Sequence, residues 1–146
     1  MRRVYPVLAG LLLFAVLAQF YFAAVGAFAH PQTDRSYALH SVTGTILIPA
    51  LSVLATIAAA LARAPRRLVA LSLAPLGLVV VQVLIIVAGF GLTGSTEDRT
   101  TPVGLAVLGL HALGGLATMG VAATVFSRAL RFARSPATER VPVGGA

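Results

Sequence analysis

Four long apolar runs limit what this chain can fold into. They lie at roughly 4–28, 38–62, 68–92 and 103–127, and each is about 25 residues long. An α-helix needs about 20 apolar residues to cross the hydrocarbon core of a bilayer. Charged residues make up only 10% of the chain, against about 25% in a typical soluble domain. The sequence therefore predicts an all-α membrane protein, a four-transmembrane-helix up-down bundle with short loops inside a lipid bilayer.

The basic residues are distributed unevenly between the two ends of this predicted bundle. Arg35 and Arg99 lie at one end. The other nine basic residues lie at the opposite end: Arg2, Arg3, Arg63, Arg66, Arg67, Arg128, Arg131, Arg134 and Arg140. By the positive-inside rule, the arginine-rich end and both termini are predicted to be cytoplasmic. The net charge of +7 is thus accounted for by arginines that fix the orientation of the helices in the membrane. No interleaving of aromatic and basic residues points to a nucleic-acid partner.

The composition also suggests the cellular setting. The chain contains arginine but no lysine, and it is rich in alanine, which is typical of a GC-rich bacterial genome. We therefore expect a multi-pass protein of the bacterial cytoplasmic (inner) membrane. The first apolar run is longer than the 7–15 apolar residues of a signal peptide, so it is predicted to remain as a helix. One transmembrane domain is expected over 1–134, followed by a mobile cytoplasmic tail over 135–146.

The two halves of the chain resemble one another. A shift of 71 residues aligns Leu39-His40 with Leu110-His111 and Gly44 with Gly115, so that both segments read Leu-His-x-x-x-Gly. A shift of 63 residues aligns Gln19 with Gln82. Because the halves run in the same direction, they predict an internal two-helix repeat about an axis along the membrane normal.

The paired histidines are the strongest functional signal. An ionisable side chain inside a membrane helix is costly, and it usually marks a functional site. Both histidines fall in the predicted outer half of the membrane, where two imidazoles from two helices can each give one ring nitrogen to a haem iron. The other ring nitrogen needs a partner, which we expect to be a backbone carbonyl one turn earlier. As alternatives, His40 is an interfacial residue, and His111 bonds Gln19 or Gln82 as part of helix packing.

Small and polar residues accompany the histidines. His40 shares a helix face with Thr43 and Gly44, and His111 shares one with Gly114 and Gly115. Such faces serve close helix packing, or they provide a flat space for a planar cofactor beside its ligand. Both readings remain open on the sequence alone.

Gln19 and Gln82 are predicted to lie near the midplane of the membrane. Glutamines at this depth usually form structural contacts between helices. They are also placed to bound the inner edge of a cofactor pocket or to meet a quinone carbonyl. His30 precedes a proline and is expected in an exposed loop, with the outer acids Asp34, Glu97 and Asp98 nearby.

Several classes of chemistry find no support in the residues. The chain has no cysteine, which removes disulfides, iron–sulfur clusters and covalently attached haem. No Gly-rich phosphate loop or Ser/His/Asp set is present, so an electron-transfer protein is expected rather than a stand-alone catalyst. No acid lies within the four runs, although proton relays usually use Asp or Glu.

On the two Leu-His-x-x-x-Gly segments, the chain resembles a family of small, uncharacterised four-helix bacterial membrane proteins. It also resembles half of haem A synthase and, more loosely, the cytochrome b561 class. These resemblances imply a b-type haem with His40 and His111 as axial ligands. Haem A synthase is similar to a doubled version with an essential outer-loop glutamate, whereas residues 29–37 contain no Glu. Haem-modifying catalysis is therefore not implied.

Two functions follow as expectations. The first is a bis-histidine haem-b protein that passes electrons between a quinone or redox partner subunit and an acceptor near the outer face. The second is a cofactor-free accessory or assembly subunit of a larger membrane complex, as part of a homo- or hetero-oligomer. The abundance of Gly and Ala, which permits close helix contact, motivates the second.

Overall fold

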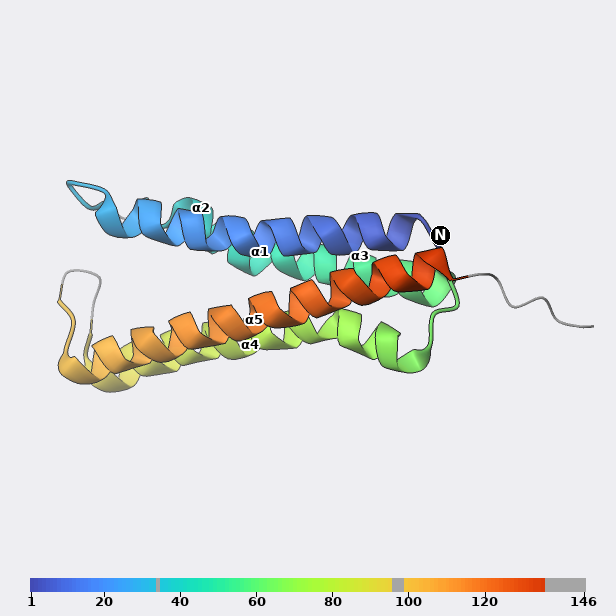
Figure 1. The fold of residues 1–146 in the computed structure, drawn as a ribbon. Coiled ribbons are helices and arrows are strands. Elements are labelled where there is room, and N and C mark those ends of the chain that lie inside the picture. The colour runs from blue at the N-terminus through green and yellow to red at the C-terminus, as the bar shows by residue number, and fades with distance from the viewer. Residues whose placement is uncertain (34, 96–98, 136–146) are drawn as a thin grey trace, which may run out of the picture.

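The computed structural model describes residues 1–33, 35–95 and 99–135, and these ranges contain helices and no strands (Figure 1). The elements are α1 (Val4–Phe28), α2 (Ala38–Val42), the π-helical turn η1 (Thr43–Leu47), α3 (Ile48–Leu61), α4 (Arg66–Thr93) and α5 (Pro102–Arg134). Since α2, η1 and α3 follow one another without a break, they form a single span. Four spans are thus long and apolar enough to cross a membrane, which confirms the predicted all-α bundle.

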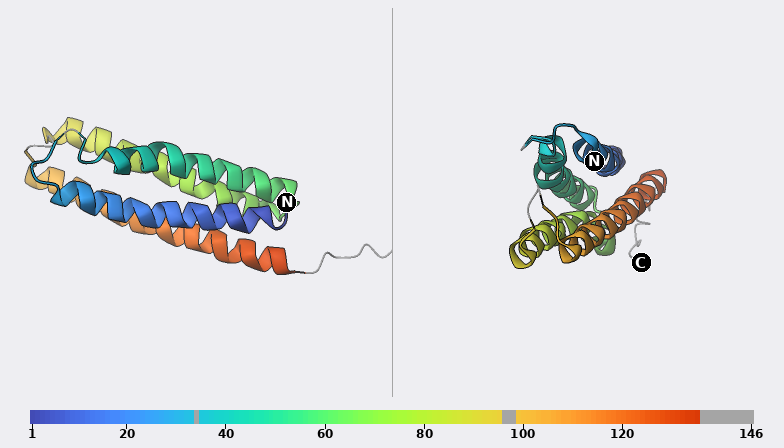
Figure 2. Two further views of the ribbon diagram at one scale, coloured as in Figure 1. Left: turned by 90° about the horizontal axis from the view of Figure 1, so that it is seen from above. Right: turned by 90° about the vertical axis from the view of Figure 1, so that its left-hand side faces the viewer.

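The four spans run up and down beside one another. α1 and α4 each pack against both α3 and α5, so the spans occupy the corners of a square (Figure 2). The start of α1 meets the end of α5, where the Arg2 guanidinium donates to the carbonyl of Phe132 at 3.1 Å. The N-terminus and the end of α5 therefore lie at the same end of the bundle, as an even number of spans requires (Figure 1).

The last helix is longer than its apolar run. We expected it to end near residue 127, but α5 continues to Arg134. Arg131 and Arg134 lie in its last turn, where positive charge interacts favourably with the helix dipole. At its start, the Thr101 hydroxyl accepts from the Gly104 amide at 3.0 Å, and Pro102 occupies the first turn. Except for Ser135, the predicted tail lies outside the described residues.

The second span is not a regular α-helix. At η1, the Ile48 amide donates to the Thr43 carbonyl five residues earlier, instead of four residues earlier as in an α-helix. Pro49 follows directly, and a proline has no amide hydrogen and its ring crowds the preceding turn. The widened turn accommodates this proline. Such π-turns are frequent at functional sites, and this one begins three residues after His40.

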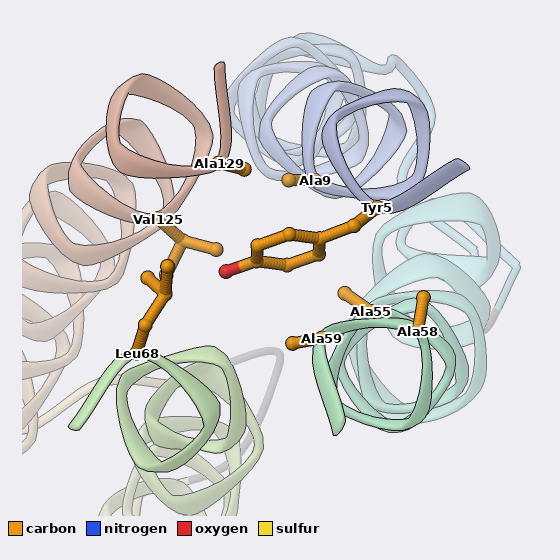
Figure 3. Packing of buried hydrophobic residues seen from close by; sticks show 8 residues of the cluster. All are labelled: Tyr5, Ala9, Ala55, Ala58, Ala59, Leu68, Val125 and Ala129. Atoms are coloured by element: carbon orange, nitrogen blue, oxygen red, sulfur yellow. The ribbon is translucent and has the colours of Figure 1, made fainter. Parts of the chain in front are cut away.

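The apolar core lies in the half of the bundle that contains the termini. Tyr5 is completely buried at its centre, surrounded mostly by alanines that let the helices approach closely (Figure 3). Its hydroxyl lies 2.7 Å from the Ser72 hydroxyl, and the Ser52 hydroxyl donates to the Ser72 carbonyl at 2.8 Å. This buried polar network connects α1, α3 and α4.

The other half of the bundle is packed differently. The two helix pairs, α1 with the second span and α4 with α5, lie farther apart there (Figures 1 and 2). The buried apolar side chains in the described residues lie in the half near the termini or, as with Val16 and Ile48, near the middle of the bundle. Beyond the middle of the bundle, the buried residues are small or polar: Gly26, Thr43, Ser95, Gly104 and Thr118. This half, which contains both histidines, therefore lacks a conventional apolar core.

Candidate functional site

His40 and His111 meet between the two halves of the chain. The centroids of their rings are 6.1 Å apart, and the ring planes are inclined by 61°. His40 comes from α2 and His111 from α5, and both side chains are partly buried. The structure therefore brings together the two side chains that the internal repeat had paired.

Two glutamines make equivalent contacts with the two histidine positions. The Gln19 amide in α1 donates to the backbone carbonyl of His40 at 2.8 Å. The Gln82 amide in α4 donates to the backbone carbonyl of His111 at 2.6 Å. The alternative in which His111 bonds Gln82 as part of helix packing therefore has a contact behind it, although the Gln82 amide bonds the His111 main chain and not its imidazole. The contacts repeat in the two halves and connect neighbouring helices.

The glycines beside the histidines make room for these glutamines. A Cβ atom added to Gly44 would overlap the Gln19 amide, and one added to Gly114 would overlap the end of Gln82. A Cβ atom on Gly115 would lie 3.4 Å from the Phe20 ring. The small-residue faces are therefore occupied by side chains, and the expected flat space directly over these glycines is wrong.

Thr43 and Thr118 are buried polar residues next to these contacts. Thr43 is 7% exposed and begins the π-turn. The Thr118 hydroxyl donates to the Gly114 carbonyl at 2.9 Å, which satisfies the hydroxyl within its own helix. Thr118 therefore has a structural role within α5, and Thr43 has one at the junction between α2 and α3.

The two imidazoles differ in their hydrogen bonding. His40 Nδ1 lies 3.2 Å from the backbone carbonyl of Gln19. Because a carbonyl only accepts, this contact places the proton on Nδ1 and leaves the lone pair of Nε2 available for a ligand. A carbonyl partner was expected, but one from the same helix. The actual partner belongs to α1, so the contact also joins two spans.

The Gln82 main chain takes the corresponding place beside the His111 imidazole, but the contact falls short of a hydrogen bond. The His111 Nδ1 is buried and makes no hydrogen bond within the described part of the chain, and the same holds for the side-chain oxygens of Gln19 and Gln82. Buried polar atoms without partners are rare and usually have an explanation such as a ligand or water. The site thus presents unsatisfied hydrogen-bonding atoms on both sides of the histidine pair.

The ring separation suits a shared metal centre. A metal bound about 2 Å from one nitrogen of each imidazole, on opposite sides, holds the ring centroids about 6 Å apart. Within the described residues, no group of three or more His, Cys, Asp or Glu side chains gathers to bind an ion. A bare ion would therefore lack protein ligands, whereas a metal in a macrocycle needs only two axial ones. The site offers the two imidazoles that the second case needs.

The sequence did not single out Tyr37. Its ring lies 6.4 Å from the ring of His40, edge to face. The available signal was its position three residues before His40, which places both residues on one helical face. His30 is exposed, as expected, and the acids Asp34, Glu97 and Asp98 lie outside the described residues.

The contact between Gly114 and Gln82 predicts a measurable change in stability. Gly114→Leu should lower the free energy of unfolding by about 1–3 kcal/mol, because the new side chain displaces Gln82 and breaks its bond to His111. Gly109→Leu is the matched control, since no atom lies within 4 Å of a Cβ atom there. Thermal unfolding in detergent compares the two. Equal shifts would show that Gln82 makes no stabilising contact at Gly114.

Comparison with known proteins adds one match. The model of a family described as being of unknown function (DUF6220) matches residues 19–89, just under half of the chain. The matched range includes Gln19, His40 and Gln82 but ends before His111. No curated protein and no solved structure matches the chain. The resemblance to haem A synthase and cytochrome b561 therefore stays a prediction.

Proposed function

We propose that this chain is an integral membrane protein that binds haem b through His40 and His111 and transfers electrons in the outer half of the membrane. The observation that carries the proposal is the 6.1 Å separation of the two imidazole rings. Two neighbouring imidazoles from different helices suit a centre that needs two axial ligands. Bound haem would supply one-electron redox chemistry.

The surrounding residues support this role by fixing the ligands. Gln19 holds the His40 main chain with its side chain, and its own carbonyl orients the His40 imidazole. Gln82 holds the main chain of His111. Partners that orient a ligating histidine also raise its basicity. In this proposal, Gln19 and Gln82 position the ligands and do not themselves bind iron.

The proposed orientation follows from charge. The start of α1, the turn between α3 and α4, and the end of α5 carry most of the arginines and lie at one end of the bundle (Figure 1). The positive-inside rule favours placing this end on the cytoplasmic side of a bacterial inner membrane. The histidines then lie in the outer half. The proposed electron partner is a membrane quinone or a redox partner subunit.

The direct test is an absorption spectrum of the full-length protein, purified in mild detergent. We expect a sharp low-spin signal in the reduced-minus-oxidised difference spectrum and about one haem per chain, as two axial histidines imply. A protein that stays colourless when haem is added would overturn the proposal.

A second function is favoured by a different observation. Gln19 and Gln82 already fill the small-residue faces at Gly44 and Gly114, so these faces serve helix packing without a cofactor. We therefore keep a cofactor-free accessory or assembly subunit as the alternative. It predicts a colourless protein whose thermal stability is unchanged when haem is added, whereas a haem protein is stabilised by its ligand.

A further inference from the structure

A shallow, open apolar groove lies on the outer surface of the bundle between α1 and α5, near the termini. Its volume is about 350 Å³. It is lined by Pro6, Val7, Gly10, Leu11, Phe126 and Leu130. Gly10 gives the groove its depth, because a Cβ atom there would lie 3.1 Å from the Phe126 ring. The groove is lined by apolar atoms and is open on one side, as a site for an acyl chain would be.

Two arginines flank the end of this groove that is nearest to the termini. Arg3 directly precedes α1 in a helical backbone conformation and lies four residues before Val7, which continues the groove face of that helix. Arg134 follows Leu130 by four residues and continues the corresponding row on α5. α1 and α5 run antiparallel, and Arg2 contacts Phe132, so Arg3 and Arg134 lie at the same end of the groove. Both side chains are exposed.

The two arginines differ from their neighbour Arg2. The Arg2 guanidinium donates to the Phe132 carbonyl and lies 4.6 Å from the centre of the Phe132 ring, so it is held within the protein. No acidic residue occurs among residues 1–33, 35–95 and 99–135 that would neutralise Arg3 and Arg134. The groove thus combines a shallow apolar surface with two guanidinium groups that no acid of the described residues neutralises.

We infer that this groove binds an anionic phospholipid, with an acyl chain along α1 and α5 and the phosphate at Arg3 and Arg134. Guanidinium groups recognise phosphate oxygens with paired hydrogen bonds. Anionic lipids are attracted to basic residues at the cytoplasmic surface, where the positive-inside rule places this end. The site lies at the opposite end of the bundle from the histidines and does not depend on haem.

Charge argues against a second copy of the chain as the occupant. A two-fold symmetric contact through this groove would place the same surface on both sides. Arg3 and Arg134 of the two copies would then face each other without an intervening acid from the described residues, and like charges repel. A phospholipid satisfies both the apolar channel and the charge.

The test measures phospholipid binding to the full-length protein in neutral detergent by native mass spectrometry. Phosphatidylglycerol and phosphatidylcholine with identical acyl chains serve as probes. The wild-type protein should prefer phosphatidylglycerol, and the double variant R3Q/R134Q should bind it at least tenfold more weakly, since each arginine interacts with the phosphate. The control R66Q/R67Q removes the same charge at the start of α4 and should change binding less than twofold.

A third variant tests the groove itself. Val7 is 61% exposed, so V7W should fold normally while its ring fills the channel, and it should weaken the binding of both lipids. If R3Q/R134Q and R66Q/R67Q weaken phosphatidylglycerol binding equally, the lipid is held by general charge attraction, and the proposed site is overturned. Equal binding of the two lipids by the wild-type protein would overturn it too. A dimer in light scattering that V7W disrupts would assign the groove to a second copy.

Discussion

His111→Ala is expected to reduce the bound haem to less than about a tenth of the wild-type content, because the iron loses one of two axial ligands. His40→Ala should have an effect of the same size. The His111 Nδ1 makes no hydrogen bond of normal geometry among the described residues, whereas His40 Nδ1 contacts the Gln19 carbonyl. The measurement is haem per chain, together with the low-spin absorption bands after purification.

The control for these variants is His30→Ala. His30 is exposed and lies outside the helices, so its removal should leave the haem content unchanged. If the His40 and His111 variants both keep the wild-type spectrum, the two histidines are not the ligands. If His30→Ala loses as much haem as they do, the loss reflects handling of the protein and not the ligands.

Tyr5→Ala is expected to cause the largest loss of stability, about 3–5 kcal/mol, because it removes a fully buried aromatic ring from the only strongly packed half of the described bundle. Tyr5→Phe keeps the ring and removes the hydrogen bond to Ser72, so it should cost only about 1 kcal/mol. The free energy of unfolding is measured by denaturant titration in mixed micelles.

Tyr21 provides the matched control for this comparison. It lies on the same helix but is 67% exposed, so Tyr21→Ala should change the free energy of unfolding by less than about 0.5 kcal/mol. The Tyr5 variants do not alter the histidine site, and their effect is therefore independent of haem. A Tyr5→Ala shift as small as that of Tyr21→Ala would show that this core does not determine stability.

The helices could be predicted well from the sequence because a segment that crosses the bilayer must be apolar along its whole length. The apolar runs marked all four spans, since each must be about as long as the membrane is thick. The end of the last helix was predicted less well. Hydropathy falls after residue 127, but residues 128–134 alternate arginine with Ala, Leu and Phe and continue the helix beyond the apolar run.

The candidate site was predicted in part. The internal repeat identified His40 and His111, and also Gln19 and Gln82, because polar residues are rare enough in apolar helices to be compared between halves. It did not predict which atoms bond. Whether Gln82 reaches the imidazole or the carbonyl of His111 depends on rotation and separation of the helices to within an ångström. Residue spacing along one helix contains no such information.

The π-turn has a consequence for comparing the two halves. It contains one residue more per turn than an α-helix, so it rotates the preceding part of the span by about one residue, roughly 100°. Gln19 packs against Gly44, four residues after His40, whereas Gln82 packs against Gly114, three residues after His111. A gapless alignment pairs Gly44 with Gly115, but its spatial counterpart is Gly114. The residues that match in the sequence alignment of the two halves are therefore not the residues that occupy equivalent positions in space, and the offset at this glycine is one residue.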